Sequence, residues 1–499
     1  MPSPPTILAA SLAGALSVLL LRRLVQRKAA SLPPGPSGWP LIGNVLDMPA
    51  VAEWLTFAEW GAKWGAMCSV TLLGQPIVIL NSASAMEDMD TKGAVVSTRP
   101  RLPMAGELLG YVQTLVLMPY GSRFRIFRKH FAKLLGTPGA VRPYIPLVEA
   151  ETHRFLRRLL SKPDATLVSA HLRKLTGAII LRITYGIEVQ EEEDPFITII
   201  EKANDNFNAA TAPGAFLVDV FPAMMYIPEF LAPFKRTGRR WAVGTKAMVE
   251  APYLFTQRQM SAGIAPGSFV SSLLDHEEKL TQEEMDDIKH TAASLYGGGA
   301  DTTAASLYAF FLAMVLAPDV QHAAQAEIDS VIGGGRLPVY ADREQLPYVS
   351  AVVTELFRWH SVAPLGVPHA ALEDTVVNGY FLPKGTLIIA NLWNILNDPA
   401  TYPAPAAFDP SRYLSASPQR DPRTLCFGFG RRVCPGRELA EMSLFTCVAT
   451  TLAVFDIAAG EGPVPVHENT QGTISHPKPF DCVVRPRSER AVALISGEA

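Results

Sequence analysis

Cysteine is scarce and irregularly placed in this chain. Only five cysteines occur in 499 residues, and the pattern Cys-x-x-Cys is absent. An odd number at irregular spacing supports neither a disulfide framework nor a zinc site. The sequence also lacks an Asn-x-Ser/Thr acceptor for N-glycosylation. Together, these absences favour a main body that faces the cytosol.

The chain also lacks an excess of charge. Its 44 lysines and arginines nearly balance 47 aspartates and glutamates, so the sequence shows no electrostatic footprint for nucleic acid. It contains no internal repeat, no convincing linker, and no flavin- or nicotinamide-binding segment. One large domain is therefore expected, and any redox chemistry in it would need electrons from another protein.

A long apolar run opens the chain. Residues 2–21 carry no charge, and a basic cluster follows from Arg22 to Lys28. The run is long enough to span a bilayer, and positive charge after it indicates a cytoplasmic main domain rather than the alternative, a cleaved signal peptide. We expect a membrane anchor at 1–28, a stiff proline-rich neck at 29–45 and one domain at 46–499.

The patterning beyond the neck is mainly helical. A hairpin of β-branched strands is predicted at 67–81, helices at 146–186 and 196–210, and a further strand at Leu387–Ala390 after a hairpin turn at Asn378-Gly379. Aromatic residues and prolines gather between 211 and 240. That apolar segment is either core or a surface that dips into the membrane, and we favour the membrane slightly.

The longest predicted helix carries an unusual centre. Thr281 opens it with a capping box, and nothing stops it before Pro318, which makes it on the order of 50 Å long. Three glycines lie at 297–299, and each costs about 1 kcal/mol relative to alanine inside a helix. Room for something flat or diatomic beside the backbone would explain them, whereas a tolerated kink is the alternative. Asp301 and Thr302 follow directly, an acid and a hydroxyl suited to relaying protons.

Two charged side chains lie one turn apart on another apolar helix. Glu355 and Arg358 interrupt the otherwise apolar segment Val352–Trp359. An isolated Glu-x-x-Arg pair is usually a surface pair of little energetic value. On this helix the pair is more consistent with burial, where each charge needs several partners.

The segment Phe427–Gly436 places one cysteine in anion-stabilising surroundings. It reads FGFGRRVCPG and precedes a segment of helical spacing. We expect Pro435 at the first helical position, so that Cys434 faces the positive end of a helix dipole beside Arg431 and Arg432. These surroundings favour a thiolate over a buried structural cysteine. A lone soft thiolate suits haem iron better than zinc.

Together these motifs resemble the cytochrome P450 family of haem-thiolate monooxygenases, over essentially the whole chain. The resemblance implies a mainly α fold with small β-sheets, built around a long helix that crosses the haem. The cysteine loop matches the family's haem-binding signature at its fixed positions, namely Phe427, Gly430, Arg432, Cys434 and Gly436. It implies haem b (iron protoporphyrin IX), with Cys434 as the iron ligand.

The resemblance also implies roles for residues outside the cysteine loop. Asp301 and Thr302 match the oxygen-activation motif on the opposite face of the cofactor, and Arg412 joins Glu355 and Arg358 in a buried cluster. The further residues implied to hold haem propionates, besides Arg432, are Arg128 and His369. Phe124 stands where the family usually has tryptophan, so one propionate hydrogen bond is expected to be missing.

Residues 364–369 and 391–399 resemble fungal secondary-metabolism members of the family. Such enzymes are single-pass proteins of the endoplasmic reticulum membrane, and an NADPH-cytochrome P450 reductase supplies their electrons, with or without cytochrome b5. The expected reaction is hydroxylation or another oxidation of a small to medium lipophilic natural product, a terpenoid first and an aromatic or polyketide compound second. A haem-thiolate isomerase or dehydratase that needs no dioxygen stays open, and a non-enzymatic haem sensor is the remaining alternative.

The substrate pocket is expected to be mostly apolar. Its predicted walls are Arg99–Met118, 204–220, Leu295–Thr302, Val362–Val367 and Gln471–Ile474. The apolar side chains expected to line it are Leu108, Leu109, Ala363, Leu365, Val367 and Ile474.

Overall fold

The structure, a computed structural model, describes residues 31–212, 214–275 and 280–497. The predicted membrane anchor at 1–28 and the first two residues of the predicted neck lie outside this range.

Helices make up most of the described chain, as the sequence predicts. The longer ones are α2 (Glu53–Trp64), α3 (Ala83–Asp90), α4 (Ser122–Leu135), α6 (Ile145–Ser161), α7 (Ala165–Tyr185), α8 (Pro195–Thr211), α10 (Pro233–Ser261), α12 (Gln282–Leu316), α13 (Pro318–Val331), α14 (Pro347–Trp359), α17 (Arg437–Val454) and α18 (Glu489–Ser496). Short helical segments between them are α5 (Pro138–Val141), α9 (Leu217–Val220), α11 (Phe269–Asp275), α15 (Leu392–Leu396) and α16 (Arg423–Cys426).

The strands form three small sheets. The largest has the order β1 (Met67–Leu72), β2 (Gln75–Leu80), β6 (Leu387–Ala390) and β3 (His369–Ala370). In it β2 runs parallel to β6, which joins segments more than 300 residues apart, and the other pairs are antiparallel. The two remaining sheets are antiparallel pairs, β4 (Thr375–Val377) with β5 (Tyr380–Leu382), and β7 (Phe455–Ala459) with β8 (Cys482–Pro486).

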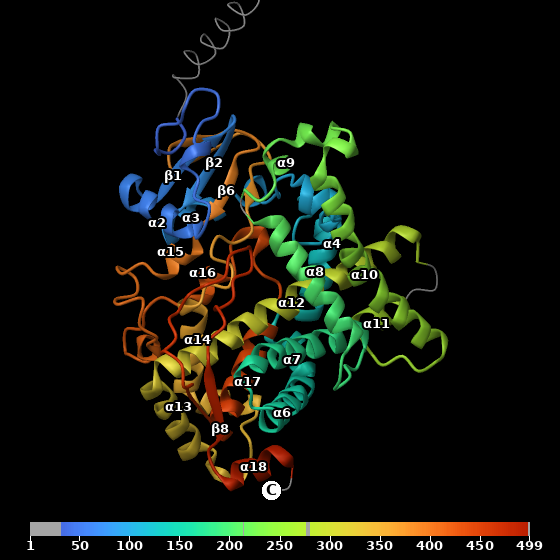
Figure 1. The fold of residues 1–499 in the computed structure, drawn as a ribbon, viewed down its shortest axis with the longest axis vertical. Coiled ribbons are helices and arrows are strands. Elements are labelled where there is room, and N and C mark those ends of the chain that lie inside the picture. The colour runs from blue at the N-terminus through green and yellow to red at the C-terminus, as the bar shows by residue number, and fades with distance from the viewer. Residues whose placement is uncertain (1–30, 213, 276–279, 498–499) are drawn as a thin grey trace, which may run out of the picture.

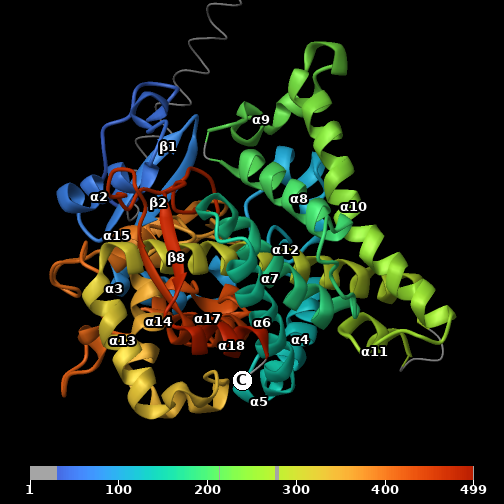
Figure 2. The ribbon, with the colours of Figure 1, turned by 60° about the horizontal axis from the view of Figure 1, so that its bottom comes forward.

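Helix α12 is the centre of the core. Its capping box is present, with Thr281 Oγ1 accepting from the Glu284 N–H and Glu284 Oε2 accepting from the Thr281 N–H. The helix then continues to Leu316, because Pro318 starts α13 and cannot extend the ladder. Figure 1 and Figure 2 show α12 crossing the middle of the molecule, where it packs against α7, α8, α10 and α17.

Among the described residues α12 is also the one helix long and apolar enough to cross a membrane. Most of its apolar window is buried inside the protein, which identifies it as a core helix.

The three central glycines of α12 do not serve a single purpose. The helix is unbroken through 297–299, so they produce no interruption of the α-helical pattern. A Cβ at Gly299 would lie 2.9 Å from Ile180 on α7, which makes this glycine a close-packing position. At Gly298 a Cβ would meet no atom within 4 Å. The expectation of open space beside the backbone therefore applies to Gly298 and not to Gly299.

The segment between α8 and α10 is part core and part surface: Val218 is buried in the main core, and Phe216, Met224 and Met225 pack against it. Its most accessible apolar side chains are Leu217, Tyr226, Phe230 and Leu231, which are 64–88% exposed. In both ribbon views the α9 region lies at the same end of the molecule as the β1–β2 hairpin, where the described chain begins (Figure 1, Figure 2). Both alternatives therefore apply to part of the segment: some of its apolar side chains are core, and the exposed ones remain available for the predicted membrane contact.

Candidate active site

One cavity of about 400 Å³ lies between α12, the cysteine loop, the end of α14 and α4. It is lined by most of the residues that the sequence singles out: Arg128, Asp301, Thr302, His369, Phe427, Arg432, Cys434 and Gly436. Asp301 is the single carboxylate among its described lining residues. The predicted site residues therefore converge on one interior space.

The cysteine loop is shaped by two glycines and one backbone hydrogen bond. Gly428 and Gly430 have φ values of +78° and +62°, in the left-handed region that L side chains rarely adopt. At Gly430 a Cβ would also approach Asp90 to 2.9 Å. The N–H of Cys434 donates to the carbonyl of Phe427 at 2.8 Å. The loop thus turns back on itself and presents the cysteine side chain to the cavity.

Cys434 is accessible, but its accessible surface faces the interior cavity. Burial raises the pKa of its thiol, while a hydrogen bond from the Gly436 backbone and the charges of Arg128 and Arg437 oppose that increase. A bound metal would remove the remaining cost, because coordination deprotonates a thiol outright.

Two details of the sequence expectation for this loop are wrong. Pro435 is not the first helical residue, since α17 begins at Arg437 with Gly436 as its N-cap. Arg431 is exposed, and the arginines that act on the sulfur are Arg128 and Arg437. The anion-stabilising surroundings are therefore present but come partly from α4, far away in the sequence.

Three arginines that line the cavity gather beside the cysteine loop; Arg432 is buried, and Arg99 and Arg128 are half-buried. Arg432 donates to the carbonyls of Ser97, Leu115 and Met118 at 2.6–3.1 Å. Arg99 donates to the carbonyls of Val116, Val367 and Pro368, and Arg128 donates to the carbonyl of Val433 at 2.7 Å.

Burial lowers the pKa of all three guanidinium groups, and the charge of a neighbouring arginine contributes for Arg99 and Arg432. The pKa of Arg432 falls to about 9. Within the described chain none of the three has a carboxylate partner within ion-pair distance, although carboxylates pair with many other arginines here. Buried cations without counter-charges are costly. A cofactor with two carboxylates and a soft-ligand metal, which is the chemistry of haem, therefore fits this cavity.

His369 lies beside these arginines in a fixed tautomer. Its Nδ1–H donates to the carbonyl of Val96 at 2.9 Å, and its ring stacks on Phe429 at 4.4 Å between centroids. Burial, together with the charges of Arg99 and Arg432, lowers its pKa to about 3. Neutral His369 therefore leaves Nε2 as an acceptor, and only its protonated form could donate to a propionate.

Phe124, which stands in place of the usual tryptophan, lies directly under a guanidinium. The Arg432 Cζ lies 3.9 Å from the centroid of the Phe124 ring, a cation–π contact. Phe124 therefore retains the flat surface that supports Arg432, and what it lacks is the indole N–H donor.

Asp301 and Thr302 lie on α12 and have separate partners. Thr302 Oγ1 donates to the carbonyl of Gly298 at 2.9 Å, one turn earlier in the helix. Asp301 Oδ1 lies 3.1 Å from Nε2 of His476. Burial alone would raise the pKa of Asp301, but the hydrogen bond and charge of His476, with the charge of Arg173, hold it below its usual value. The acid is therefore ionised and held by a partner.

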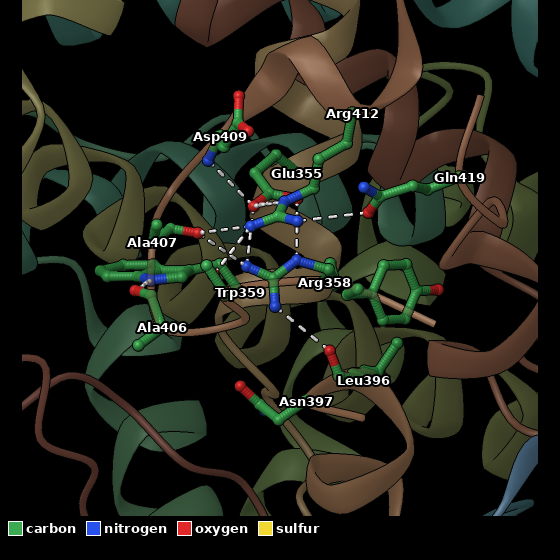
Figure 3. A network of polar contacts seen from close by, with 12 residues as sticks. Glu355, Arg358, Trp359, Leu396, Asn397, Ala406, Ala407, Asp409, Arg412 and Gln419 are labelled. Carbon is green, nitrogen blue, oxygen red and sulfur yellow. Dashed lines mark hydrogen bonds and ion pairs between the residues drawn. The ribbon is translucent and has the colours of Figure 1, made fainter. Parts of the chain in front are cut away.

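Glu355, Arg358 and Arg412 meet in a closed polar network, shown in Figure 3. Glu355 Oε1 lies 2.7 Å from Arg358 Nη2 and 3.2 Å from Arg412 Nε, and neither Glu355 nor Arg358 has any exposed side-chain surface. The carboxylate also accepts from the Asp409 N–H and the Tyr413 hydroxyl. Burial of the Glu-x-x-Arg pair is thus confirmed, and each charge has several partners.

This network supports the cysteine loop through one ring contact. Phe357, on the same helix as Glu355, packs on Phe427 with ring centroids 5.1 Å apart. The rigid end of α14 therefore lies directly against the loop that carries Cys434.

The predicted pocket walls are correct in part. Ala363, Leu365, Val367 and Ile474 line the cavity. Leu108 and Leu109 do not: Leu109 is buried in the hydrophobic core, and Leu108 packs where a Cβ on Gly238 would be.

Two residues of the site are not predicted from the sequence. Arg99 is expected only as part of a pocket wall, although Arg99-Pro100 offers an arginine in a proline-fixed turn. Nothing in the local sequence of His476 distinguishes it.

Comparison with known proteins agrees with this geometry. The family model described as Cytochrome P450 matches residues 33–484. The chain is 48% identical over 482 residues to Cytochrome P450 monooxygenase 208 of Postia placenta, covering 94% of this chain and 93% of that protein. It is 43% identical to Cytochrome P450 monooxygenase claR of Ampulloclitocybe clavipes (97% and 91% covered) and 40% identical to Cytochrome P450 monooxygenase ppsD of Aspergillus oryzae (96% and 93%). The chain therefore belongs to the cytochrome P450 family and is a haem-binding monooxygenase.

Proposed function

We propose that this monooxygenase oxidises a small to medium lipophilic natural product, a terpenoid above other classes, in fungal secondary metabolism. The observation that carries the proposal is the cavity itself. Apolar side chains dominate its walls, and its cations cluster beside the cysteine loop, where the cofactor's carboxylates would use them. No described lining residue other than Asp301 could pair with a cationic substrate. An aromatic or polyketide substrate is the second candidate.

The proposed division of labour follows from the contacts. Cys434 would ligate the iron as a thiolate, and Arg99, Arg128 and Arg432 would hold the propionates. When bound, haem supplies an iron centre that activates dioxygen with two electrons from outside, and thiolate ligation favours O–O cleavage. Asp301 would hold a proton at Oδ1 and pass it toward the Thr302 hydroxyl, whose position is fixed by the Gly298 carbonyl. The apolar walls would orient the substrate and exclude water.

The acid–alcohol pair favours oxygen activation over the isomerase or dehydratase alternative. By family resemblance, members that need no dioxygen often lose this pair, whereas activation of dioxygen needs two protons delivered at that position. Turnover that requires neither reductase nor oxygen would support the alternative, and absence of any turnover with all candidate scaffolds would support a sensor.

We further propose a reductase partner and attachment to the endoplasmic reticulum membrane. Members of the family take electrons from reductases, and this sequence has no flavin-binding segment of its own. Leu217, Tyr226, Phe230 and Leu231 form an exposed apolar surface near the beginning of the described chain. Such a surface suits contact with a bilayer beside the predicted anchor at 1–28.

A binding screen followed by product analysis tests the proposal. Candidate terpenoid, aromatic and polyketide scaffolds are titrated against the purified haem protein, and the change in iron spin state reports binding. Products are then identified after turnover with reductase, NADPH and oxygen. Cys434→Ala tests the iron ligand and should lose the haem-thiolate absorbance of the carbon-monoxide complex. Retention of that absorbance would contradict the assignment of Cys434, and preferential oxidation of charged polar compounds would contradict the substrate class.

A further inference from the structure

Asp301 is paired with a residue 175 positions further along the chain. His476 Nε2 lies 3.1 Å from Asp301 Oδ1, and the two side chains are only 14% and 12% exposed. No second carboxylate lies within ion-pair distance of this histidine in the described chain. The contact is therefore specific to the acid that stands next to Thr302.

The segment that carries His476 is held in place from three directions. The N–H of His476 donates to Thr470 Oγ1 at 2.9 Å, and its carbonyl accepts from the Thr470 N–H at 2.8 Å. The N–H of Ile474 donates to Asn208 on α8, and the N–H of Ser475 donates to the carbonyl of Val362 after α14. Since Ile474 also lines the main cavity, the imidazole is delivered to Asp301 by a fixed wall of the active site.

A second, small cavity adjoins Asp301 between α7, α8 and α12. Its volume is about 10 Å³, and Arg173, Glu201, Asp205 and Asp301 all line it. That is close to the space that one water molecule needs. Arg173 Nε is buried without a hydrogen-bond partner in the described chain, which suits a water there.

We propose that His476 recharges Asp301 with protons, so that it acts as a positioning and relay residue behind the proposed acid–alcohol pair. This inference rests on the proposed role of Asp301. Within the described chain the ring contact of His476 with Asp301 is made by Nε2, which leaves Nδ1 as the nitrogen that would exchange protons with water. His476 would receive protons at Nδ1 and release them at Nε2.

The step balances without any electron transfer. The Nε2–H bond of His476 breaks and an O–H bond forms on the ionised Asp301 Oδ1, and Asp301 then gives this proton toward Thr302. At the same time Nδ1 takes a proton from hydronium in the solvent, which is released as water, so the neutral imidazole changes tautomer and keeps its charge. Loss of the Nδ1 proton to solvent and gain of a proton at Nε2 then restore the starting tautomer.

The charges around the pair allow this transfer. Arg173 on α7 faces Asp301, Glu201 and Asp205 on α8 lie across the small cavity, and His360 at the end of α14 is close enough to interact with His476. Burial raises the pKa of Glu201, and Asp205 and Asp301 add to the increase. Glu201 therefore holds its own proton more tightly than usual and lacks direct contact with Asp301, which leaves His476 as the donor in contact.

The test separates relay from simple positioning by two substitutions. His476→Gln keeps an N–H donor for Asp301 but cannot relay a proton, and His476→Ala removes both. His322→Gln on the exposed face of α13 is the matched control. The first readout needs no turnover: the C–O stretch of the ferrous carbon-monoxide complex is followed against pH. His476→Ala should move its midpoint upward, because burial raises the pKa of Asp301 once His476 is gone.

The second readout is the partition of electrons from NADPH, with reductase present, between hydrogen peroxide and water or product. For both His476 variants we expect the proton-dependent rate to fall by roughly 100-fold and peroxide to rise accordingly. The solvent isotope effect should change in the two variants and stay at the wild-type value in His322→Gln.

Wild-type coupling in His476→Gln would overturn the relay, because a merely positioning histidine tolerates that substitution. An unchanged C–O midpoint in His476→Ala would overturn the link to Asp301 itself. A haem-thiolate carbon-monoxide band in every variant shows that the proposed function stands even if the relay fails. Loss of that band in the wild type would instead refute the haem-thiolate site.

Discussion

Glu355→Gln should destabilise the protein strongly, although the two side chains have nearly the same shape. The carboxylate accepts five hydrogen bonds, and the side chains of Glu355 and Arg358 are completely buried. One negative charge already serves two guanidinium groups, and backbone carbonyls such as those of Leu396 and Ala407 accept the remaining N–H groups (Figure 3). An amide nitrogen in place of Oε2 would oppose the Arg358 Nε–H and leave the Tyr413 hydroxyl without its acceptor.

Breaking such a buried pair costs about 3–5 kcal/mol. At roughly 2.1 cal/mol/K per residue, the unfolding entropy of a chain this long is about 1 kcal/mol/K. The expected fall in Tm is therefore about 3–5 °C. The measurement is thermal unfolding of the haem-loaded protein, followed by both helical circular dichroism and the haem-thiolate absorbance. The haem-thiolate absorbance should be lost at a lower temperature than the helical signal, because Phe357 on the same helix as Glu355 packs on Phe427 of the cysteine loop.

Glu468→Gln provides the control for this prediction. Glu468 pairs with Lys478 at 2.6 Å, yet the two side chains are 55% and 57% exposed. Exposed pairs contribute about 0–1 kcal/mol, so its Tm should change by at most about 1 °C. If Glu355→Gln and Glu468→Gln shifted Tm equally, the account of Glu355 as a buried charge with an obligatory role would be wrong.

Three further predictions concern cofactor retention and pH. Arg99→Met should stabilise the haem-free protein slightly while speeding haem loss to apomyoglobin, and slower or unchanged loss would contradict the assignment of Arg99 to a propionate. Phe124→Trp should slow haem loss by about 10-fold or more if its indole N–H reaches a propionate, since a hydrogen bond to a charged group contributes about 1.5–3 kcal/mol, provided that Arg432 stays stacked on the larger ring. Burial lowers the pKa of His360 to about 3. Between pH 6.5 and pH 3, His360 therefore binds a proton in the unfolded chain but not in the folded chain. The free energy of unfolding should therefore fall as pH drops from 6.5 toward 3, by about 3 kcal/mol at two pH units below 6.5. His360→Gln keeps a donor for the Ser475 carbonyl and should flatten this pH dependence, measured by urea unfolding. An unchanged slope in the variant would contradict the assignment to His360.

Local chemistry made much of the fold predictable. The capping box at Thr281 and the proline at 318 determine where α12 begins and ends, and both bounds are nearly as predicted. The strand Leu387–Ala390 and the turn at Asn378-Gly379 are also correct, because positive φ at both turn residues suits asparagine followed by glycine. What these features share is that neighbours in sequence decide them.

The errors and omissions all involve tertiary contacts. Whether Leu109 faces the cavity or the core depends on how its segment is rotated in the fold, which the spacing of apolar residues in the sequence does not determine. Gly299 is glycine because Ile180 approaches it from another helix, a reason that sequence alone cannot distinguish from room for a ligand. His476 meets Asp301 only because hydrogen bonds to α8 and to the end of α14 fix its loop. The family resemblance located the chemistry, but the partners of each charge needed the structure.

The arginine cluster connects cofactor binding with folding. Arg99, Arg128 and Arg432 face the interior cavity, with pKa values held low by desolvation and no carboxylate partner in the described chain. Their hydrogen bonds to backbone carbonyls orient them but supply no opposite charge. Without a dianion, these charges oppose the closed arrangement of α4, the cysteine loop and the segment around Ser97. Two propionates would reverse that opposition, and whatever binds only the folded state stabilises it. Haem loading is therefore expected to complete the fold around Cys434, and the same charges that make the empty site costly make it selective for a dianionic cofactor.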